Sequence, residues 1–183
     1  MIEYSKKERE QHTRSKRILL SKKTRRIIMS SSEIKNVLDL LTHGVYIIGV
    51  KYRSKINGMT AAWVNQMSSQ PPMVSVAVGK SHYTSELISK AKYFSINILS
   101  PNQTELARKC GLISGRNQDK LQEEEITYQA TGAPILTNCA AYLDCKLSHQ
   151  FEVGDHILFI GTVIKANIKN QSVLIFRSSD FFN

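Results

Sequence analysis

Six polar side chains whose types suit a phosphate group fall within residues 57–99 of the chain. Hydroxyl groups, an amide and one lysine are groups that bind phosphate oxygens. Small residues stand among them, as in Thr60-Ala61-Ala62, and these let a flat ligand approach the backbone. If the extended segments around them pair, the pattern predicts a site for a flat cofactor with a phosphate tail at the end of a β-sheet. The six are Thr60, Asn65, Ser68, Lys80, Ser81 and Thr84.

Extended segments must position these side chains. Residues 45–52 are β-branched and aromatic, which favours a strand. The Asn57-Gly58 pair predicts a turn over residues 55–58, followed by a returning strand over 59–66. After Pro71-Pro72, valines alternate with small residues over 73–78, which is typical of a half-buried strand. Residues 93–99 predict a further strand.

Short helices separate the strands. Ser32 is expected to cap a helix over residues 33–41. Ser81 is expected to cap a helix over 81–91, whose first N–H groups would face an anion. Residues 101–109 suit a third helix that ends at Gly111, and the polar residues 112–131 are interpreted as a mobile excursion near a pocket mouth.

Three more strands are expected over residues 140–149, 157–168 and 173–176. The chain therefore has many strands, few short helices and no βαβ alternation. This pattern predicts a mainly β fold with short helices, an antiparallel barrel rather than a doubly wound sheet.

Charge is concentrated at the start of the chain. Residues 1–30 contain ten Lys and Arg and three Glu, a net charge of +7 out of +10 for the whole chain. We expect residues 1–28 to be a basic, poorly ordered arm and residues 29–183 to be the folded domain. The arm is open to three interpretations: an inert extension, an oligomer contact or an anion-binding segment.

The cysteines and the apolar runs indicate the compartment. Cys110, Cys139 and Cys145 are an odd set without metal-binding spacing, which favours reduced thiols and predicts no metal site. No apolar run approaches the ~20 residues that cross a bilayer, and a secretory h-region is lacking. We therefore expect a cytoplasmic protein that does not bind membranes.

Four motifs, taken in order, resemble the flavin reductase-like family. These are Gly58-Met59-Thr60-Ala61-Ala62-Trp63, Pro71-Pro72, residues 94–99 (Phe-Ser-Ile-Asn-Ile-Leu) and Gly154-Asp155-His156 followed by Gly161 and Val163. The resemblance covers about residues 33–180. It implies an FMN-binding antiparallel split β-barrel, mostly homodimeric, of the flavoredoxin or NAD(P)H:flavin oxidoreductase type.

The resemblance also implies roles for individual residues. Thr60, Ala61, Ala62 and Trp63 would contact the isoalloxazine. Asn65 and Ser68 would lie beside the ribityl chain and phosphate, and Lys80, Ser81 and Thr84 would complete the phosphate pocket. Asn97 would lie beside the ring or support that wall, and His156 would face the flavin where a nicotinamide stacks.

Three functions remain open from the sequence. The first is an enzyme that passes electrons from NADH or NADPH through FMN, or FAD, to free flavin, an oxygenase partner or another acceptor. The second is an FMN electron carrier that turns over reduced nicotinamide poorly. The third is a non-enzymatic module that uses the basic arm on nucleic acid, although we do not expect a nucleic-acid partner. A related barrel family that oxidises pyridoxine phosphates fits the motifs less well.

Overall fold

The computed structural model describes residues 30–170 and 172–176. Contacts divide the chain into two units, Met1–Leu41 and Thr42–Asn183, and each is considered by itself. The basic arm over residues 1–28, and its predicted boundary with the folded domain, lie outside the described residues. Within the described part of the chain, no helix is both long enough and apolar enough to cross a membrane.

The described part of the first unit contains helix α2, Ser31–Leu38. Its N-cap is Ser30, not Ser32 as the sequence predicted, and the helix ends three residues earlier than expected. The reason is a capping box: the Ser30 hydroxyl accepts a hydrogen bond from the Glu33 N–H at 3.2 Å, and the Glu33 carboxylate accepts one from the Ser30 N–H at 2.7 Å.

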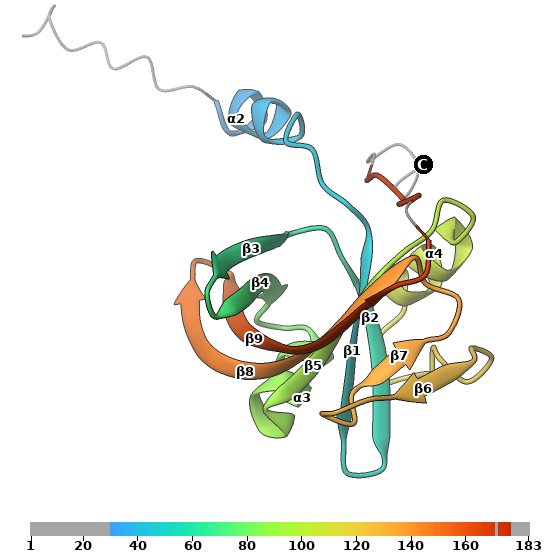
Figure 1. The fold of residues 1–183 in the computed structure, drawn as a ribbon. Helices are drawn as coiled ribbons and strands as arrows, with labels where there is room; N and C mark the ends of the chain where they lie inside the picture. Colours follow the sequence, from blue (N-terminus) through green and yellow to red (C-terminus); the bar gives the residue numbers. More distant parts are fainter. Residues whose placement is uncertain (1–29, 171, 177–183) are drawn as a thin grey trace, which may run out of the picture. The chain divides into compact units, whose positions relative to one another are not determined.

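The second unit is built on an antiparallel sheet of seven strands in the order β2-β1-β5-β8-β9-β4-β3, with a separate two-stranded sheet of β6 and β7. Figure 1 shows the long β8 and β9 curving together across the fold. The mainly β architecture predicted from the sequence is confirmed. The strands are β1 (Tyr46–Tyr52), β2 (Lys55–Ala61), β3 (Val64–Ser69), β4 (Pro72–Gly79), β5 (Tyr93–Ile98), β6 (Ile126–Tyr128), β7 (Pro134–Leu136), β8 (Ala141–Val153) and β9 (His156–Ile168).

The turn predicted at Asn57-Gly58 is wrong, because both residues lie inside β2. The β1–β2 turn is formed four residues earlier by Arg53 and Ser54, with Arg53 at a φ of 55°. Asn57 is buried and donates a hydrogen bond to Thr84, and a Cβ at Gly58 would lie 2.9 Å from the Leu121 side chain. Tertiary packing, and not local turn preference, therefore determines the conformation of Asn57-Gly58. The predicted strand over 59–66 is divided between β2 and β3.

The described part of the second unit contains two helices, and both begin later than predicted. Helix α3 spans Tyr83–Ala91, and its N-cap is His82, whose side chain makes no capping hydrogen bond; Ser81 is therefore not the cap. Helix α4 spans Thr104–Leu112 and includes Gly111, which was expected to end it. Buried Ala107 and Cys110 hold this helix against the core through its last turn.

The C-terminal half departs from the sequence prediction in two places. The stretch 112–131 is not simply a mobile excursion, because Lys120 and Leu121 are buried and β6 pairs with β7. Residues 173–176 form an isolated bridge between Gly44 and Ile175 instead of a strand. The strands expected over 140–149 and 157–168 are confirmed as parts of β8 and β9.

Strand β1 is buried on both faces, so it separates two clusters of the hydrophobic core. Ile48 packs with Phe94 and Phe159 in the first cluster, which fills the barrel. Ile47 packs with Leu99 and with Leu136 of β7 in the second cluster. Helix α4 contributes Ala107 and Cys110 to the second cluster, so this helix is fixed beside β2 by apolar packing.

Asn97 on β5 belongs to the structural framework between the two sheets. Its Nδ2 donates to the Ile47 carbonyl at 3.0 Å, and its Oδ1 accepts from the Leu136 N–H at 2.8 Å. It is 1% exposed, so water cannot replace these partners. The side chain therefore ties β7 to β1 and β5.

We predict that Asn97→Ala lowers the free energy of unfolding by about 2–3 kcal/mol, because two buried backbone groups lose their partner. Urea unfolding followed by circular dichroism measures the loss. Asn65→Ala on the exposed strand β3 is the control and should change stability by less than about 0.5 kcal/mol. Equal stabilities for the two variants would contradict this role of Asn97.

Candidate functional site

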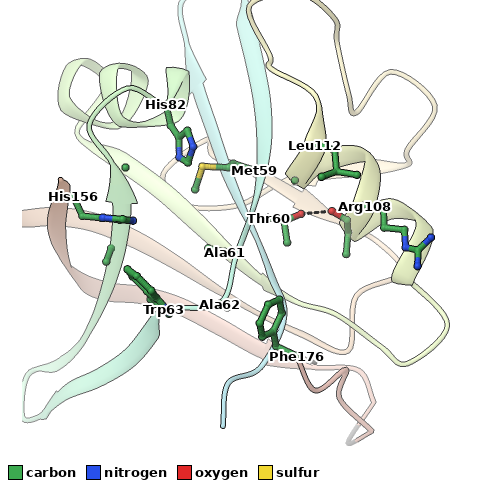
Figure 2. A pocket seen from close by; sticks show the side chains of 14 residues that line it. Met59, Thr60, Ala61, Ala62, Trp63, His82, Arg108, Leu112, His156 and Phe176 are labelled. Atoms are coloured by element: carbon green, nitrogen blue, oxygen red, sulfur yellow. Dashed lines mark hydrogen bonds between the residues drawn. The ribbon is translucent and has the colours of Figure 1, made fainter. Parts of the chain in front are cut away.

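A cavity of about 390 Å³ lies between β2 and β4, two strands that are not neighbours in the sheet. Because β2 is an edge strand, its outer side offers backbone N–H and C=O groups to a ligand. Figure 2 shows the cavity with helix α4 on one side and Trp63 and His156 on the other. The volume is in the range of small-molecule sites. The lining residues are Met59, Thr60, Ala61, Ala62, Trp63, Ala77, Gly79, His82, Ala107, Arg108, Gly111, Leu112, His156 and Phe176.

Short side chains form much of this wall. Ala61 and Ala62 come from the end of β2 and the residue after it, and Ala77 and Gly79 come from β4. The Thr60 hydroxyl donates to the Ala107 carbonyl at 2.6 Å, a hydrogen bond drawn in Figure 2. This bond holds β2 against α4, and the small residues leave room for a flat group to lie close to the backbone.

An aromatic pair borders the cavity. The ring centroids of Trp63 and His156 are 4.8 Å apart, with their planes tilted by 39°. Trp63 is 51% exposed, so it is not a core residue. The Nδ1 atom of His156 lies 2.7 Å from the Asp155 carboxylate, and this hydrogen bond from the imidazole lowers the pKa of Asp155. The carboxylate thus fixes the imidazole through Nδ1 and leaves Nε2 for other contacts.

A second lobe of about 290 Å³ shares Met59, Thr60, His82, Gly111 and Leu112 with the first. We call the first cavity the ring lobe and this one the tail lobe. The tail lobe begins at the N-terminus of α3 and extends to the segment after α4. Its remaining lining residues are Ser81, Tyr83, Thr84, Cys110, Ile113, Ser114, Gly115 and Lys120.

The structure brings together seven of the eleven residues singled out from the sequence. Thr60, Ala61, Ala62, Trp63 and His156 line the ring lobe, and Ser81, Thr84 and again Thr60 line the tail lobe. The hydroxyl of Thr84 accepts a hydrogen bond from the Asn57 amide at 2.7 Å. The shared lining of the two lobes places the ring and phosphate parts of the predicted site side by side.

The other four residues lie elsewhere. Asn65 and Ser68 are on β3, which is mostly exposed, and Asn97 is in the framework described above. The Lys80 ammonium pairs with Glu152 at 2.7 Å, and its backbone N–H donates to the Asp155 carbonyl at 3.0 Å. None of the four is among the lining residues of either lobe.

Sequence reasoning missed His82, Arg108, Phe176 and Lys120 as site residues. His82 follows Ser81 and lines both lobes, so its place in the loop was a usable signal. Lys120 gave no signal, because it stands in a polar, charged stretch where a lysine is normally solvated. Among the described residues, no group of His, Cys, Asp and Glu is arranged to hold a metal ion.

Residues 38–183 match the flavin reductase like domain. The chain belongs to this family. The flavin reductase-like motifs recognised in the sequence, from Gly58 to Val163, all lie within the matched region. The split-barrel fold implied by the resemblance is confirmed, since the solved structures with similar folds include flavoredoxin and flavin reductases.

Three relatives illustrate the range of this flavin reductase-like family. The high molecular weight rubredoxin of Moorella thermoacetica is 35% identical over 73% of this chain, which spans only 59% of that protein's length. The reductase component of a 4-nitrophenol 4-monooxygenase/4-nitrocatechol 2-monooxygenase from Rhodococcus opacus is 30% identical over 84% of this chain and 80% of its own. The crystal structure of flavoredoxin from Methanosarcina acetivorans has a TM-score of 0.68 and 31% identity, covering 72% of each chain.

Cys110 lines the tail lobe, but its thiol is not activated as a nucleophile. Burial raises its pKa to about 11, and burial likewise raises the pKa of Cys145 to about 12. A thiol pKa two units above its reference value of 9.0 reduces the thiolate fraction near neutral pH about 100-fold.

We therefore predict that a thiol reagent at pH 8 labels Cys110, Cys139 and Cys145 slowly in the native protein. All three thiols should react faster in 8 M urea, Cys110 on the order of 100-fold faster. Mass spectrometry of the labelled peptides identifies each site. Rapid labelling of Cys110 in the native state would show that the tail lobe exposes and activates this thiol.

Proposed function

We propose that this chain is an FMN-binding flavin oxidoreductase that takes electrons from NADH or NADPH. The observation that carries the proposal is the joined pair of lobes: one lined by short side chains and bordered by Trp63 and His156, the other lined by hydroxyls and a lysine. Membership in the flavin reductase-like family supports it. When bound, a flavin supplies the redox chemistry by accepting a hydride and passing electrons on.

The residues present fit such a group. The ring lobe places Ala61, Ala62, Ala77 and Gly79 where larger side chains would fill the space of a flat heterocycle. The tail lobe adds the hydroxyl groups of Ser81 and Thr84 and the ammonium group of Lys120. Hydroxyl and ammonium groups are suitable partners for the hydroxyls and the phosphate of a flavin tail.

In this proposal, the chain's own side chains orient the reactants. Thr60 holds the edge of β2 against α4 and so fixes the backbone along which the ring would lie. Trp63 and His156 offer an aromatic surface where a nicotinamide would stack, and Asp155 holds the imidazole in one orientation. His156 therefore acts on the electron donor, and its loss should leave FMN binding intact.

The acceptor and the assembly are part of the same proposal. The name of the Rhodococcus relative supports an oxygenase partner that receives reduced flavin, and free flavin is the simplest alternative acceptor. We also propose a homodimer and a cytoplasmic location. The second is supported by three free, buried cysteines, which are typical of a reducing compartment.

An FMN electron carrier is the second candidate, and the structural similarity to flavoredoxin favours it. The two functions differ in the rate at which NADH or NADPH reduces the bound flavin. An enzyme oxidises NADH or NADPH with an added acceptor over many turnovers, whereas a carrier binds FMN but is reduced slowly by either nucleotide. The arm-based binding module would instead show no flavin affinity.

The test of the function is a flavin titration followed by turnover. We expect the purified chain to show, or to gain on adding FMN, visible absorption bands shifted from those of free FMN, with the flavin fluorescence quenched. Anaerobic addition of NADH and of NADPH should then bleach the bands. Protein that binds neither FMN nor FAD at micromolar concentrations would overturn the proposal.

We predict that His156→Ala lowers kcat/KM for the nicotinamide donor about fivefold to tenfold, the magnitude of one lost aromatic contact. The affinity for FMN should stay within about twofold, because the imidazole serves the donor side. Stopped-flow reduction and fluorescence titration measure the two quantities separately. The matched control is His149→Ala, which removes an exposed histidine stacked on Phe151 outside both lobes. If both variants reduce at the wild-type rate, His156 does not belong to the donor site.

A further inference from the structure

Lys120 is a buried lysine that lines the tail lobe. It is 3% exposed, and its Nζ donates to the Cys110 carbonyl at 3.0 Å and to the Ile113 carbonyl at 2.9 Å. Both carbonyls belong to the end of α4. The side chain therefore binds the C-terminal turn of this helix, and Lys120 is also one of the residues that line the tail lobe.

The ammonium group of Lys120 forms no ion pair within the described part of the chain. The lysines at positions 35, 80, 90 and 109 each pair with a carboxylate at 2.5–2.7 Å, and all four are more exposed than Lys120. No described carboxylate forms an ion pair with Lys120, and burial lowers the pKa of its amine. Buried charges are normally paired, because carbonyl dipoles only partly replace the water that a cation loses. An anion in the lobe would supply the missing charge.

The other groups around the tail lobe also suit an anion that ends a hydroxylated chain. The N-terminus of α3 opens into it, and the His82 side chain leaves the first N–H groups of this helix uncapped. Ser81 and Thr84 add hydroxyls.

We propose that Lys120, and not Lys80, is the cation that binds the phosphate of the flavin tail, so that the site selects phosphorylated flavin over riboflavin. This inference rests on the proposed flavin function. It assigns a specificity-determining residue that lies far along the chain from the hydroxyls it works with. Lys80 is engaged by Glu152 on the other side of the loop and braces the turn that carries His156.

The test compares FMN with riboflavin in three proteins: wild type, Lys120→Met and Lys80→Met. Fluorescence quenching gives the dissociation constant for each flavin, without any need for turnover. We expect Lys120→Met to weaken FMN binding about 10- to 100-fold, the range for one charge-assisted hydrogen bond, and to leave riboflavin within about threefold. Lys80→Met, the matched loss of a lysine charge, should leave both constants within about twofold of wild type.

Three results would overturn the assignment. Wild-type protein that binds FMN and riboflavin equally well has no phosphate selection. A parallel loss of both flavins in Lys120→Met makes the lysine a structural brace only. A loss of the preference for FMN over riboflavin in Lys80→Met would show that Lys80 binds the phosphate. Each of these leaves the flavin function standing, whereas a wild-type chain that binds neither flavin rejects both proposals.

A second measurement on unmodified protein covers the case in which Lys120→Met fails to fold. A buried ammonium exchanges its protons slowly, so protein labelled with ¹⁵N-lysine should give a distinct Nζ signal for Lys120 in NMR spectra. We expect FMN to shift this signal and riboflavin to leave it in place. A signal unmoved by saturating FMN would reject the contact.

Discussion

Strand β2, which lies at the edge of the large sheet, is tied to α3 and to α4 by two side-chain hydrogen bonds. The Asn57 amide donates to Thr84 on α3, and the Thr60 hydroxyl donates to the Ala107 carbonyl on α4. A strand at the edge of a sheet has one strand partner and would otherwise be free to close against β4 or to pair with another chain. Residues of β2 line both lobes, which it shares with β4 in the ring lobe and with the start of α3 in the tail lobe. The site therefore depends on an edge strand that two helices hold in place.

The strands and the family could be predicted because their signals are local. Val74, Val76 and Val78 alternate with small residues and are all buried in β4, as predicted, although Ser75 between them is buried too. Asn57-Gly58 failed because the same dipeptide that favours a turn is here packed under Leu121 and bonded to α3. A local turn preference of this kind is smaller than the energy of a buried hydrogen bond and close packing. Only the tertiary structure reveals which of the two determines the conformation.

The two lysines show the same limit within the site. Lys80 was assigned to the phosphate because it precedes Ser81, yet a side chain next to a site in sequence can point to a different neighbour, and here that neighbour is Glu152. Lys120 lies far from those hydroxyls in sequence and was counted among solvated charges. Its burial depends on how the segment after α4 folds back onto the last turn of that helix. The sequence therefore predicted hydroxyl groups of the tail lobe, but it could not predict which lysine contributes the positive charge.

The two lobes share five residues, but each also has lining of its own. The ring lobe alone takes residues from β2, β4 and β9 and from the middle of α4, whereas the tail lobe alone takes them from the start of α3 and from the end of α4 with the segment after it. Substitutions confined to the residues of one lobe alone leave the lining of the other unchanged, so affinity for the ring system and preference for what is attached to it can diverge. A protein engineer could exploit this modularity by recruiting a differently substituted heterocycle through changes in residues 113–120 alone.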